Sequence, residues 1–484
     1  MAIGPATLWR MRPSGNVLNG SAFDPTISGA GTNYTQQDVA QLSLSDLAAT
    51  QNSTTIISVT GGFTAAMIGN AIRIAASSNF ILGYYFVTGY TNTNTITVDR
   101  APCTAGIGTG GSGKLGGANT LNSGAWPEFV NGSAAAGVKM VAGNTLYIYG
   151  SGSRIGITDT VTYDYLFSSY YASAITGDST NGFIHFIGEN GTPRFKYIGA
   201  PLVFYGTLNS WIENIDILLG EGTYGAFYST GPIILNCRVN VNGFNSIGIQ
   251  SSSGVVMSCE VYGGASPSGT SAGITGGGLG CFLEGNYVHN VAGVGIDAAD
   301  ATSTVINNLI VSPGSHGINY SFSNYPGVIA NNTIVSPGGH GINITTQVAL
   351  LTSRTINNFI ANVTGAGKYG IAVGTGTTVA NDRIAGIIKY NAYYNCTNGI
   401  SLNFSGGSNN VIVGADPFVS AITGNYSLNA NNPGGAQVKA MANPGLFPGN
   451  AQLTKSYLDI GAVQHADTSA SANIIRSHII QRIR

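Results

Sequence analysis

Short apolar runs alternate with polar turns along the chain, and from about residue 211 this alternation becomes a repeat. The first of two markers is a Gly-Ile dipeptide, which recurs at intervals of 25, 22, 22, 24, 29 and 29 residues from Gly248-Ile249 to Gly399-Ile400. The second marker is a small polar residue, then any residue, then an apolar one, as in Asn308-Leu309-Ile310. Two markers that stay in phase over seven repeats predict a solenoid, in which one structural unit stacks on the next.

A single repeat is predicted to contain three short strands. Val305-Ile306, Leu309–Val311 and Gly317–Tyr320 are apolar or alternating runs, and Gly, Pro, Ser and Asn separate them. No helix is expected here, because the apolar positions lack a 3.6-residue period and Gly and Pro interrupt every few positions. Stacked repeats would pair each strand in parallel with its equivalent, about 4.8 Å away.

Stacking also predicts ladders of equivalent residues. The isoleucine of the first marker should point inward and form one ladder, which includes Ile296, Ile318 and Ile342. The asparagine of the second marker should form another at a turn, because Asn tolerates a positive φ and its amide can bond the next amide. This second ladder includes Asn308, Asn332 and Asn358.

These features resemble the right-handed parallel β-helix proteins, the pectate lyase-like group. The resemblance covers residues ~125–465, from a first strand within Gly143–Tyr149 to a closing segment that contains Tyr457–Val463. It implies an all-β fold, a right-handed parallel β-helix of about eleven coils and roughly 50 Å in length. Residues ~125–142 and ~416–465 are expected to cap its ends, since open ends would expose strand edges.

The first 120 residues show a different pattern. Strands are predicted at 54–59, 71–74, 84–87 and 95–98, and the glycine-rich run 106–117 is interpreted as a linker. Scattered positions in this region resemble a small β-domain that precedes β-helices in phage-encoded structural proteins. The resemblance implies a domain that attaches the chain to a particle.

The last residues, 466–484, form a separate C-terminal tail. Ile475, Ile479 and Ile483 would share one face of a helix. Two interpretations stay open for this tail: a segment used in packing or assembly, and a frayed chain end.

The composition excludes several classes of protein. Only 8% of residues are charged while 43% are hydrophobic, so the chain can bury a large core and is not disordered. A net charge of −1 predicts binding neither to nucleic acid nor to an anionic membrane. The sequence has no apolar run of about 18 residues, so no membrane span is predicted. The N-terminus lacks the apolar region of a secretory signal.

Five cysteines predict neither a disulfide framework nor a zinc site, because no C-x-x-C occurs. Cys237 and Cys259 occupy equivalent repeat positions, which leaves a disulfide or two thiols as alternatives. Buried thiols are favoured, since side chains in register run parallel to one another. No cofactor and no metal are expected.

A Gly-His-Gly sequence at 339–341 resembles one motif of the pectinolytic hydrolases of this fold. Those enzymes combine it with a cluster of three Asp and an Arg-x-Lys, which this sequence lacks. His340 also occupies a repeat position that is His316 in the preceding repeat. Lyases of this fold use a carboxylate cage for Ca²⁺, whereas only Asp297 and Asp300 lie close together between residues 200 and 400. No catalytic residue is assigned, and an enzymatic activity is not favoured.

One outward row is a candidate binding surface. The residue after each Gly-Ile should point away from the core, and this row includes Asp297, Asn319 and Asn343. His316 and His340 lie beside it in the sequence. In the β-helix group the substrate groove commonly crosses the corresponding sheet, so the resemblance implies a glycan-facing surface. The alternative is that these residues are simply solvated.

The expected function is that of a phage virion structural protein: a tailspike, a fibre or a surface decoration. The N-terminal domain would contact other virion proteins, and the β-helix would face outward on the virion surface and bind host surface polysaccharide. By resemblance to tailspikes we expect a homotrimer. Two alternatives are kept: a polysaccharide lyase or hydrolase of the pectate lyase-like fold, and an extracellular bacterial surface or matrix protein.

Overall fold

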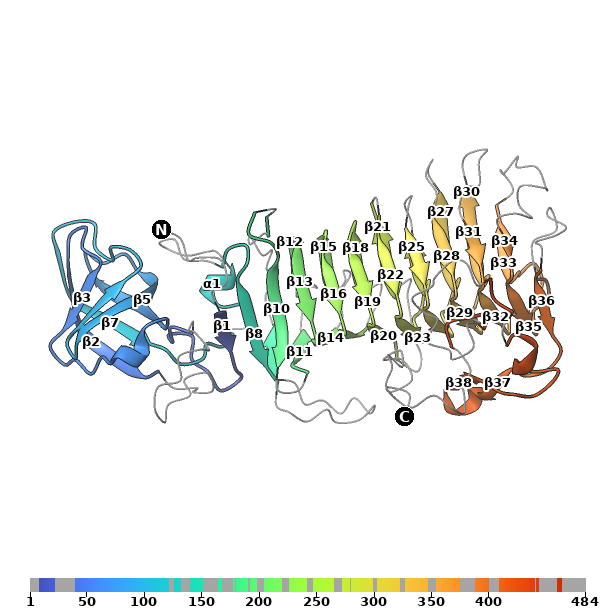
Figure 1. The fold of residues 1–484 in the computed structure, drawn as a ribbon, viewed down its shortest axis with the longest axis horizontal. Coiled ribbons are helices and arrows are strands. Elements are labelled where there is room, and N and C mark those ends of the chain that lie inside the picture. The colour runs from blue at the N-terminus through green and yellow to red at the C-terminus, as the bar shows by residue number, and fades with distance from the viewer. Residues whose placement is uncertain are drawn as a thin grey trace. The chain divides into compact units, whose positions relative to one another are not determined.

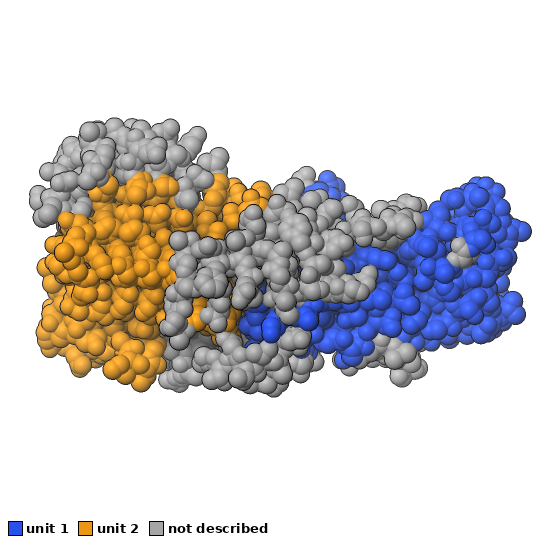
Figure 2. Space-filling view, turned by 180° about the vertical axis from the view of Figure 1, so that it is seen from behind, with its two compact units in different colours: residues 1–218 blue, residues 219–484 orange. Residues whose placement is uncertain are grey.

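A computed structural model divides the chain into two compact units, residues 1–218 and 219–484, which Figure 2 colours separately. It describes residues 8–21, 40–121, 126–131, 140–150, 164–167, 177–178, 180–189, 192–197, 204–219, 226–241, 247–264, 272–278, 280–298, 303–322, 327–346, 354–374, 388–399, 409–439, 441–443 and 459–463. Among these residues strands predominate, and the one α-helix is the short α1 (Glu128–Asn131). No helix in the described ranges could span a bilayer.

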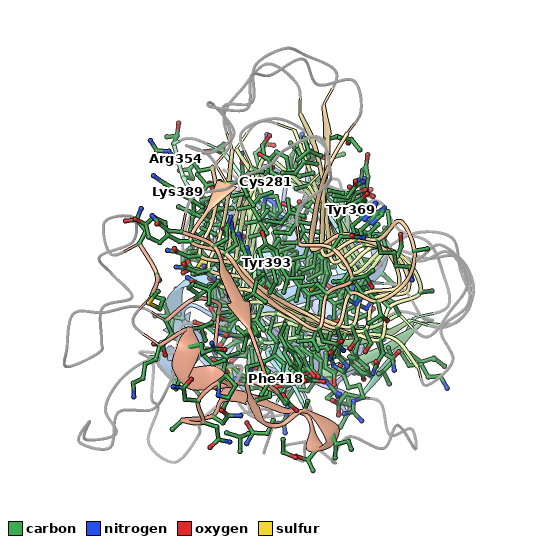
Figure 3. The ribbon with its side chains drawn as sticks, turned by 90° about the vertical axis from the view of Figure 1, so that its right-hand side faces the viewer. Cys281, Arg354, Tyr369, Lys389, Tyr393 and Phe418 are labelled. Carbon is green, nitrogen blue, oxygen red and sulfur yellow. The ribbon has the colours of Figure 1, made fainter. Side chains whose placement is uncertain are left out.

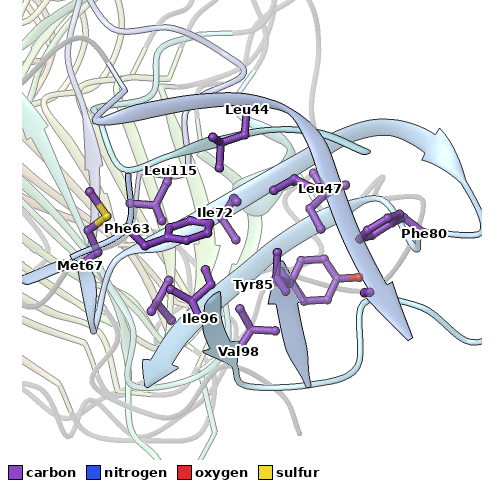
Figure 4. Close-up of a cluster of buried hydrophobic side chains, with 14 of the residues drawn as sticks. Leu44, Leu47, Phe63, Met67, Ile72, Phe80, Tyr85, Ile96, Val98 and Leu115 are labelled. Atoms are coloured by element: carbon purple, nitrogen blue, oxygen red, sulfur yellow. The ribbon is translucent and has the colours of Figure 1, made fainter. Parts of the chain in front are cut away.

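The first unit contains a closed antiparallel barrel. Its strands, in the order β2-β3-β6-β5-β4-β7 around the barrel, are β2 (Leu42–Thr50), β3 (Thr55–Ser58), β6 (Thr95–Val98), β5 (Gly83–Asn92), β4 (Ala71–Ser78) and β7 (Ile107–Leu115). Leu47, Phe63, Ile72, Tyr85 and Ile96 fill its core, as Figure 4 shows. The prediction of an N-terminal β-domain is therefore confirmed, and each of the four strands expected within it is present.

The interpretation of residues 106–117 as a linker is wrong, because most of this run is strand β7. Its glycines allow close approach within the barrel. A Cβ atom on Gly108 would lie 2.6 Å from the Phe80 ring, and one on Gly113 would lie 2.8 Å from Leu47 Cδ1. Register shifts where β7 pairs with β2 and β4 show that the strand is also irregular. Glycine content here reflects tight packing and bulges, which sequence composition does not separate from a linker.

The other strands described in the first unit belong to parallel sheets. One sheet has the order β1-β8-β10-β13, and its strands are β1 (Leu8–Met11), β8 (Thr145–Tyr149), β10 (Ile184–Glu189) and β13 (Ser210–Glu213). Further strands are β9 (Tyr165–Phe167), β11 (Arg194–Tyr197), β12 (Phe204–Leu208) and β14 (Asp216–Leu219). Strand β1 precedes the barrel in sequence but pairs with β8, which follows it (Figure 1). Along the sequence, the chain therefore contributes one strand to this sheet, then the barrel strands, and then the rest of the sheet.

The second unit is a stack of coils with three parallel sheets. The first sheet contains β16 (Ile233–Leu235), β19 (Val255–Met257), β22 (Phe282–Glu284), β25 (Thr304–Ile306), β28 (Val328–Ala330), β31 (Arg354–Ile356) and β34 (Ile388–Lys389). The second contains β17 (Arg238–Asn240), β20 (Glu260–Tyr262), β23 (Tyr287–His289), β26 (Leu309–Val311), β29 (Thr333–Val335), β32 (Phe359–Ala361), β35 (Ala392–Tyr394) and β36 (Val411–Val413). The third contains β15 (Phe227–Thr230), β18 (Ile249–Ser252), β21 (Ile274–Gly277), β24 (Ile296–Ala298), β27 (Ile318–Phe322), β30 (Ile342–Thr346) and β33 (Ile371–Val373).

The number of complete coils differs from the eleven expected. In the first unit β10, β11 and β12 form one complete coil, and in the second unit strands β16 to β33 form six successive coils that each carry all three strands. The next coil has β34 and β35, and its expected third strand at Ile400 lies outside the described residues. The repeat markers identify the coils of the second unit but do not separate complete coils from partial ones.

The predicted isoleucine ladder lies in the interior. Ile296, Ile318 and Ile342 are in register with one another and fully buried. The glycine before each isoleucine is required by sterics: a Cβ atom on Gly317 would lie 2.4 Å from Ile334 Cγ2 and 2.6 Å from the carbonyl oxygen of Gly341. The Gly-Ile marker therefore records a place where one coil lies close to the next.

The asparagine ladder is also present, and it connects successive coils by side-chain hydrogen bonds. Asn308 Nδ2 donates to Asn332 Oδ1 at 3.0 Å, and Asn332 Nδ2 donates to Asn358 Oδ1 at 2.9 Å. The ladder begins earlier and continues further than expected, with Asn286 before it and Asn391 after it. All these side chains are buried.

The reason given for asparagine at this turn needs correction. The positive φ belongs to the preceding residue, which is Asn307 (φ 58°), Asn331 (φ 55°) or Asn357 (φ 57°). The ladder asparagines instead supply inward amides that satisfy backbone groups, as when Asn332 Nδ2 donates to the carbonyl of Val305 at 2.9 Å. Two adjacent asparagines therefore have two separate functions at each turn.

The segment expected to cap the stack packs on its side. Strands β37 (Phe418–Ser420) and β38 (Asn425–Leu428) pair in antiparallel fashion. Phe418, Leu428 and Ile460 belong to one buried cluster with Leu309 and Phe359, which point outward from the second sheet. Figure 3 shows Phe418 outside the coil, while Tyr393 lies within it. Apolar residues at outward positions of the second sheet require this cover.

The remaining expectations about the ends and the cysteines have separate outcomes. The cap expected at ~125–142 is described only at 126–131, which include α1, and at 140–142, while the tail 466–484 lies wholly outside the described residues. None of the five cysteines forms a disulfide, and four of them, including Cys237 and Cys259, are buried. The preference for thiols over a disulfide is confirmed.

Candidate functional site

The outward row of the third sheet holds three polar residues at the same position in successive coils. Asp297, Asn319 and Asn343 are in direct register and partly exposed. Asn319 Nδ2 donates to Asp297 Oδ1 at 2.9 Å, and Asn343 Nδ2 donates to Asn319 Oδ1, also at 2.9 Å. Strand alternation places these side chains outside, while the isoleucines before them fill the core. The row is a line of fixed polar groups and not a set of independent side chains.

Asp297 is the one acid in this row. Partial burial raises the pKa of its carboxyl, and the hydrogen bond from Asn319 opposes that shift. The register neighbours are Thr275 on one side and Asn319 on the other, both uncharged. The row can therefore offer a carboxylate acceptor followed by amide donors and acceptors.

His316 and His340 stack on each other at the turns before β27 and β30. Their ring centroids are 5.0 Å apart and the rings are nearly parallel, with an interplanar angle of 5°. His316 Nδ1 accepts the backbone N–H of His340 at 2.9 Å, and His340 Nδ1 accepts that of Tyr369, labelled in Figure 3, at 3.1 Å. An Nδ1 that accepts a hydrogen bond leaves the proton of a neutral ring on Nε2.

Both histidines are held in the neutral form. Burial lowers the pKa of His316, and the neighbouring His340 lowers it further. Burial also lowers the pKa of His340, with a second contribution from Lys368. Each ring can thus donate one hydrogen bond through Nε2 at neutral pH.

The Gly-His-Gly sequence follows the packing of the repeat. A Cβ atom on Gly339 would lie 2.7 Å from His316 Nδ1, and one on Gly341 would lie 2.5 Å from the carbonyl oxygen of Gly370. Both glycines are explained by contact between coils. Among the described residues, no group of three His, Cys, Asp or Glu side chains could hold a metal ion.

The structure contains two clusters of polar and aromatic residues that the sequence patterns do not predict. On the second sheet, Glu260 accepts from Arg238 Nε at 2.9 Å and lies 3.2 Å from His289 Nε2. In the first unit, Trp211 and His185 lie on the outward face of β13 and β10. Equivalent positions in successive strands would have revealed the first cluster. The second is harder to find, because the repeat markers are absent from that part of the sequence.

Comparisons with known proteins bear on the fold. Residues 234–384 match the family model for the right-handed β-helix region. No curated protein sequence matches the chain.

Three solved structures resemble it distantly. Pectate lyase Pel9A is 13% identical, with a TM-score of 0.40, and the match covers 69% of this chain and 93% of that one. The catalytic domain of a GH87 α-1,3-glucanase in complex with nigerose is 11% identical, with a TM-score of 0.30 and coverage of 77% and 90%. The tailspike protein gp49 from Pseudomonas phage LKA1 is 11% identical, with a TM-score of 0.24 and coverage of 77% and 67%.

The family match supplies the handedness, which the strand pairing leaves open. The parallel register, the three strands per coil and the inward ladders agree with that match in the residues that the structure describes. This part of the chain is a right-handed parallel β-helix.

Proposed function

We propose that the protein is a structural component of a phage particle, a tailspike, fibre or surface decoration whose β-helix binds host surface glycan. The observation that carries the glycan-binding part of the proposal is the hydrogen-bonded row Asp297-Asn319-Asn343 on the third sheet. Its amide and carboxylate groups are already held in place, so they lose little side-chain entropy when they bind sugar hydroxyls. His316 and His340 add Nε2 donors from the adjacent turns.

The β-helix would serve as a rigid support for this row. The asparagine ladder and the isoleucine ladder link successive coils of the second unit. In the same proposal the N-terminal barrel contacts other virion proteins, and the chain assembles as a homotrimer on the virion surface. A single polar contact contributes about 1 kcal/mol, so useful adhesion needs several rows acting together, which a trimer and many copies on one particle supply.

The experiment measures binding and turnover together on a panel of bacterial capsular and O-antigen polysaccharides. The full chain is expected to bind at least one of them without shortening it. The double variant Asn319→Ala/Asn343→Ala should weaken the binding about thirty-fold, since it removes two contacts of about 1 kcal/mol each. Its matched control is Ser252→Ala, a partly exposed residue of β18 on the same sheet. Equal binding by the double variant and the control would refute the role of the row.

A second candidate function, cleavage of a polysaccharide, is favoured by one observation. Burial raises the pKa of Asp297, as expected for a general acid. Shortening of the polysaccharide by the chain, abolished in Asp297→Asn, would replace the structural proposal with the enzymatic one. The genes that flank the coding sequence provide an independent test: tail or capsid genes support a virion component, whereas glycan-utilisation genes contradict it.

A further inference from the structure

The outward face of β1, β8, β10 and β13 in the first unit carries aromatic and charged side chains in adjacent strands. Parallel register aligns Arg10 with Tyr147 and then with Ile187, and it aligns His185 with Trp211. Glu189 and Glu213 follow on the same face by strand alternation. We call this set Arg10, Tyr147, His185, Glu189, Trp211 and Glu213 the Trp211 face; its strands lie side by side in Figure 1.

Trp211 differs from the other two tryptophans of the chain. Trp9 and Trp126 are buried, at 0% and 3% exposure, whereas Trp211 is partly exposed on an outward strand position. Its ring stacks on His185 with centroids 5.6 Å apart and an angle of 22°. Its Nε1 donates to Glu213 Oε2 at 3.1 Å. The indole is therefore held in one orientation, and part of its surface stays accessible.

Arg10 pairs with one of the two carboxylates of this face, and the other carboxylate, Glu213, bonds the indole of Trp211. Arg10 Nη1 pairs with Glu189 Oε2 at 2.7 Å, and the guanidinium lies 4.4 Å from the centroid of the Tyr147 ring. Glu213 keeps acceptor capacity beyond its single bond from the indole. Neither ring nitrogen of His185 has a hydrogen bond to any residue that the structure describes, and burial lowers the pKa of this histidine. The face thus combines an aromatic platform with neutral and acidic hydrogen-bonding groups.

We propose that the Trp211 face binds a neutral oligosaccharide, with one pyranose ring stacked on Trp211 and its hydroxyls bonded to Glu213 and His185. The C–H face of a pyranose is apolar and suits an aromatic ring, while its hydroxyls form a polar edge. A carboxylate accepts strong hydrogen bonds from such hydroxyls. Glu189 and Glu213 disfavour a nucleic acid strand, whose bases could stack on Trp211 but whose phosphates would meet two carboxylates.

This site is separate from the row on the third sheet. It belongs to a different sheet and a different unit, so it does not depend on the function proposed above. It would give the chain a second glycan-binding site, in which the sugar stacks on the Trp211 ring. The row on the third sheet would bind sugar through polar groups alone.

The test uses the tryptophan itself as the reporter. Acrylamide quenching of the full chain reports chiefly on Trp211, because the other two tryptophans are buried. Malto-, cello-, manno- and chito-oligosaccharides are titrated, and calorimetry measures the affinity. At least one series is expected to protect Trp211 from quenching. Trp211→Ala should then weaken binding at least ten-fold, as removal of a central aromatic does.

Conservative variants and a matched control separate binding from folding. Trp211→Phe keeps a stacking ring and should bind within a few-fold of the parent chain, and Glu213→Gln should bind more weakly than Trp211→Phe. Tyr90→Ala removes another partly exposed aromatic, 38% exposed, in the barrel, and should bind like the parent. Asn319→Ala is measured alongside, because it reports on sugar bound at the row of the third sheet. If Trp211→Ala does not fold, Glu213→Gln and Trp211→Phe carry the comparison.

Three results would overturn the inference. The first is failure of all four sugar series to protect Trp211. The second is protection by an oligothymidylate or by raised protein concentration alone, which would indicate nucleic acid or a second copy of the chain. The third is an affinity lowered by Asn319→Ala but not by Trp211→Ala, which would assign the sugar to the third sheet and leave the earlier proposal standing.

Discussion

At the scale of single residues, the adjacent asparagines 331 and 332 have unequal importance for stability. Asn332 accepts two hydrogen bonds from Asn308 and donates to Asn358 and to the carbonyl of Val305. Asn331 adopts a left-handed backbone conformation, and its buried Oδ1 atom has no hydrogen-bond partner among the described residues. Asn332 is needed for its amide and Asn331 for its φ.

Asn332→Ala should therefore destabilise the chain by about 3 kcal/mol or more, because it leaves several buried polar groups unsatisfied. Asn331→Gly keeps access to the positive φ and should change the free energy of unfolding by less than about 1 kcal/mol. Urea denaturation of the two variants and the parent provides the measurement. Similar stabilities for both variants would contradict the division of roles.

The candidate binding residues are predictable to the extent that they follow the repeat. Asp297, Asn319 and Asn343 lie one residue after the inward isoleucines, so strand alternation alone places them on the outside. Their hydrogen bonds to one another are not predictable, because a sequence does not give side-chain rotamers. Trp211 and His185 escape the prediction because the register connects positions 26 residues apart where neither repeat marker is present.

At the scale of elements, the third sheet depends on glycines that permit the coils to approach closely. A Cβ atom on Gly317 would meet Ile334 and the Gly341 carbonyl at less than 2.7 Å. A Cβ atom on Gly277, in strand β21 of the same sheet, would meet no heavy atom within 4 Å, and the φ of Gly277 lies outside the left-handed region. Position in the coil, and not residue type, decides which glycine is essential.

Gly317→Ala should lower the free energy of unfolding by roughly 1–3 kcal/mol, as overpacking of a tight core does. Gly277→Ala should leave it unchanged or raise it slightly, because alanine restricts the unfolded chain. Thermal unfolding followed by circular dichroism compares the pair. A stable Gly317→Ala chain would show that the coils can separate without cost.

Elements in the first unit show where sequence patterns are ambiguous. The alternation at 95–98 is strict, and it predicts strand β6 with the bounds that the structure gives it. The glycine-rich strand β7 has the composition of a linker, since glycine serves both flexibility and close packing. A composition signal without periodicity does not distinguish the two.

At the scale of the whole molecule, the chain covers an apolar outer surface that its own repeats create. In β26 the three residues Leu309, Ile310 and Val311 are all buried, although alternation turns only Ile310 into the coil. From sequence such a run cannot be told from a strand buried on both faces by neighbouring sheets. The coil interior buries one face of this strand, and the segment that starts at β37 covers the outer face. Its assignment as an end cap is therefore wrong.

Removal of this cover should expose the outer surface of the second sheet. A chain that ends after Gly414 loses Phe418, Leu428 and Ile460, each of which buries apolar area worth roughly 1.5–3 kcal/mol. It leaves Leu309 and Phe359 in contact with water, so we expect stronger binding of a hydrophobic dye and association that rises with concentration. Dye fluorescence and light scattering measure both effects. A chain that ends after Val463 keeps the whole cluster and serves as the control; if it associates as strongly as the shorter chain, the association arises from loss of the tail and not from the exposed sheet.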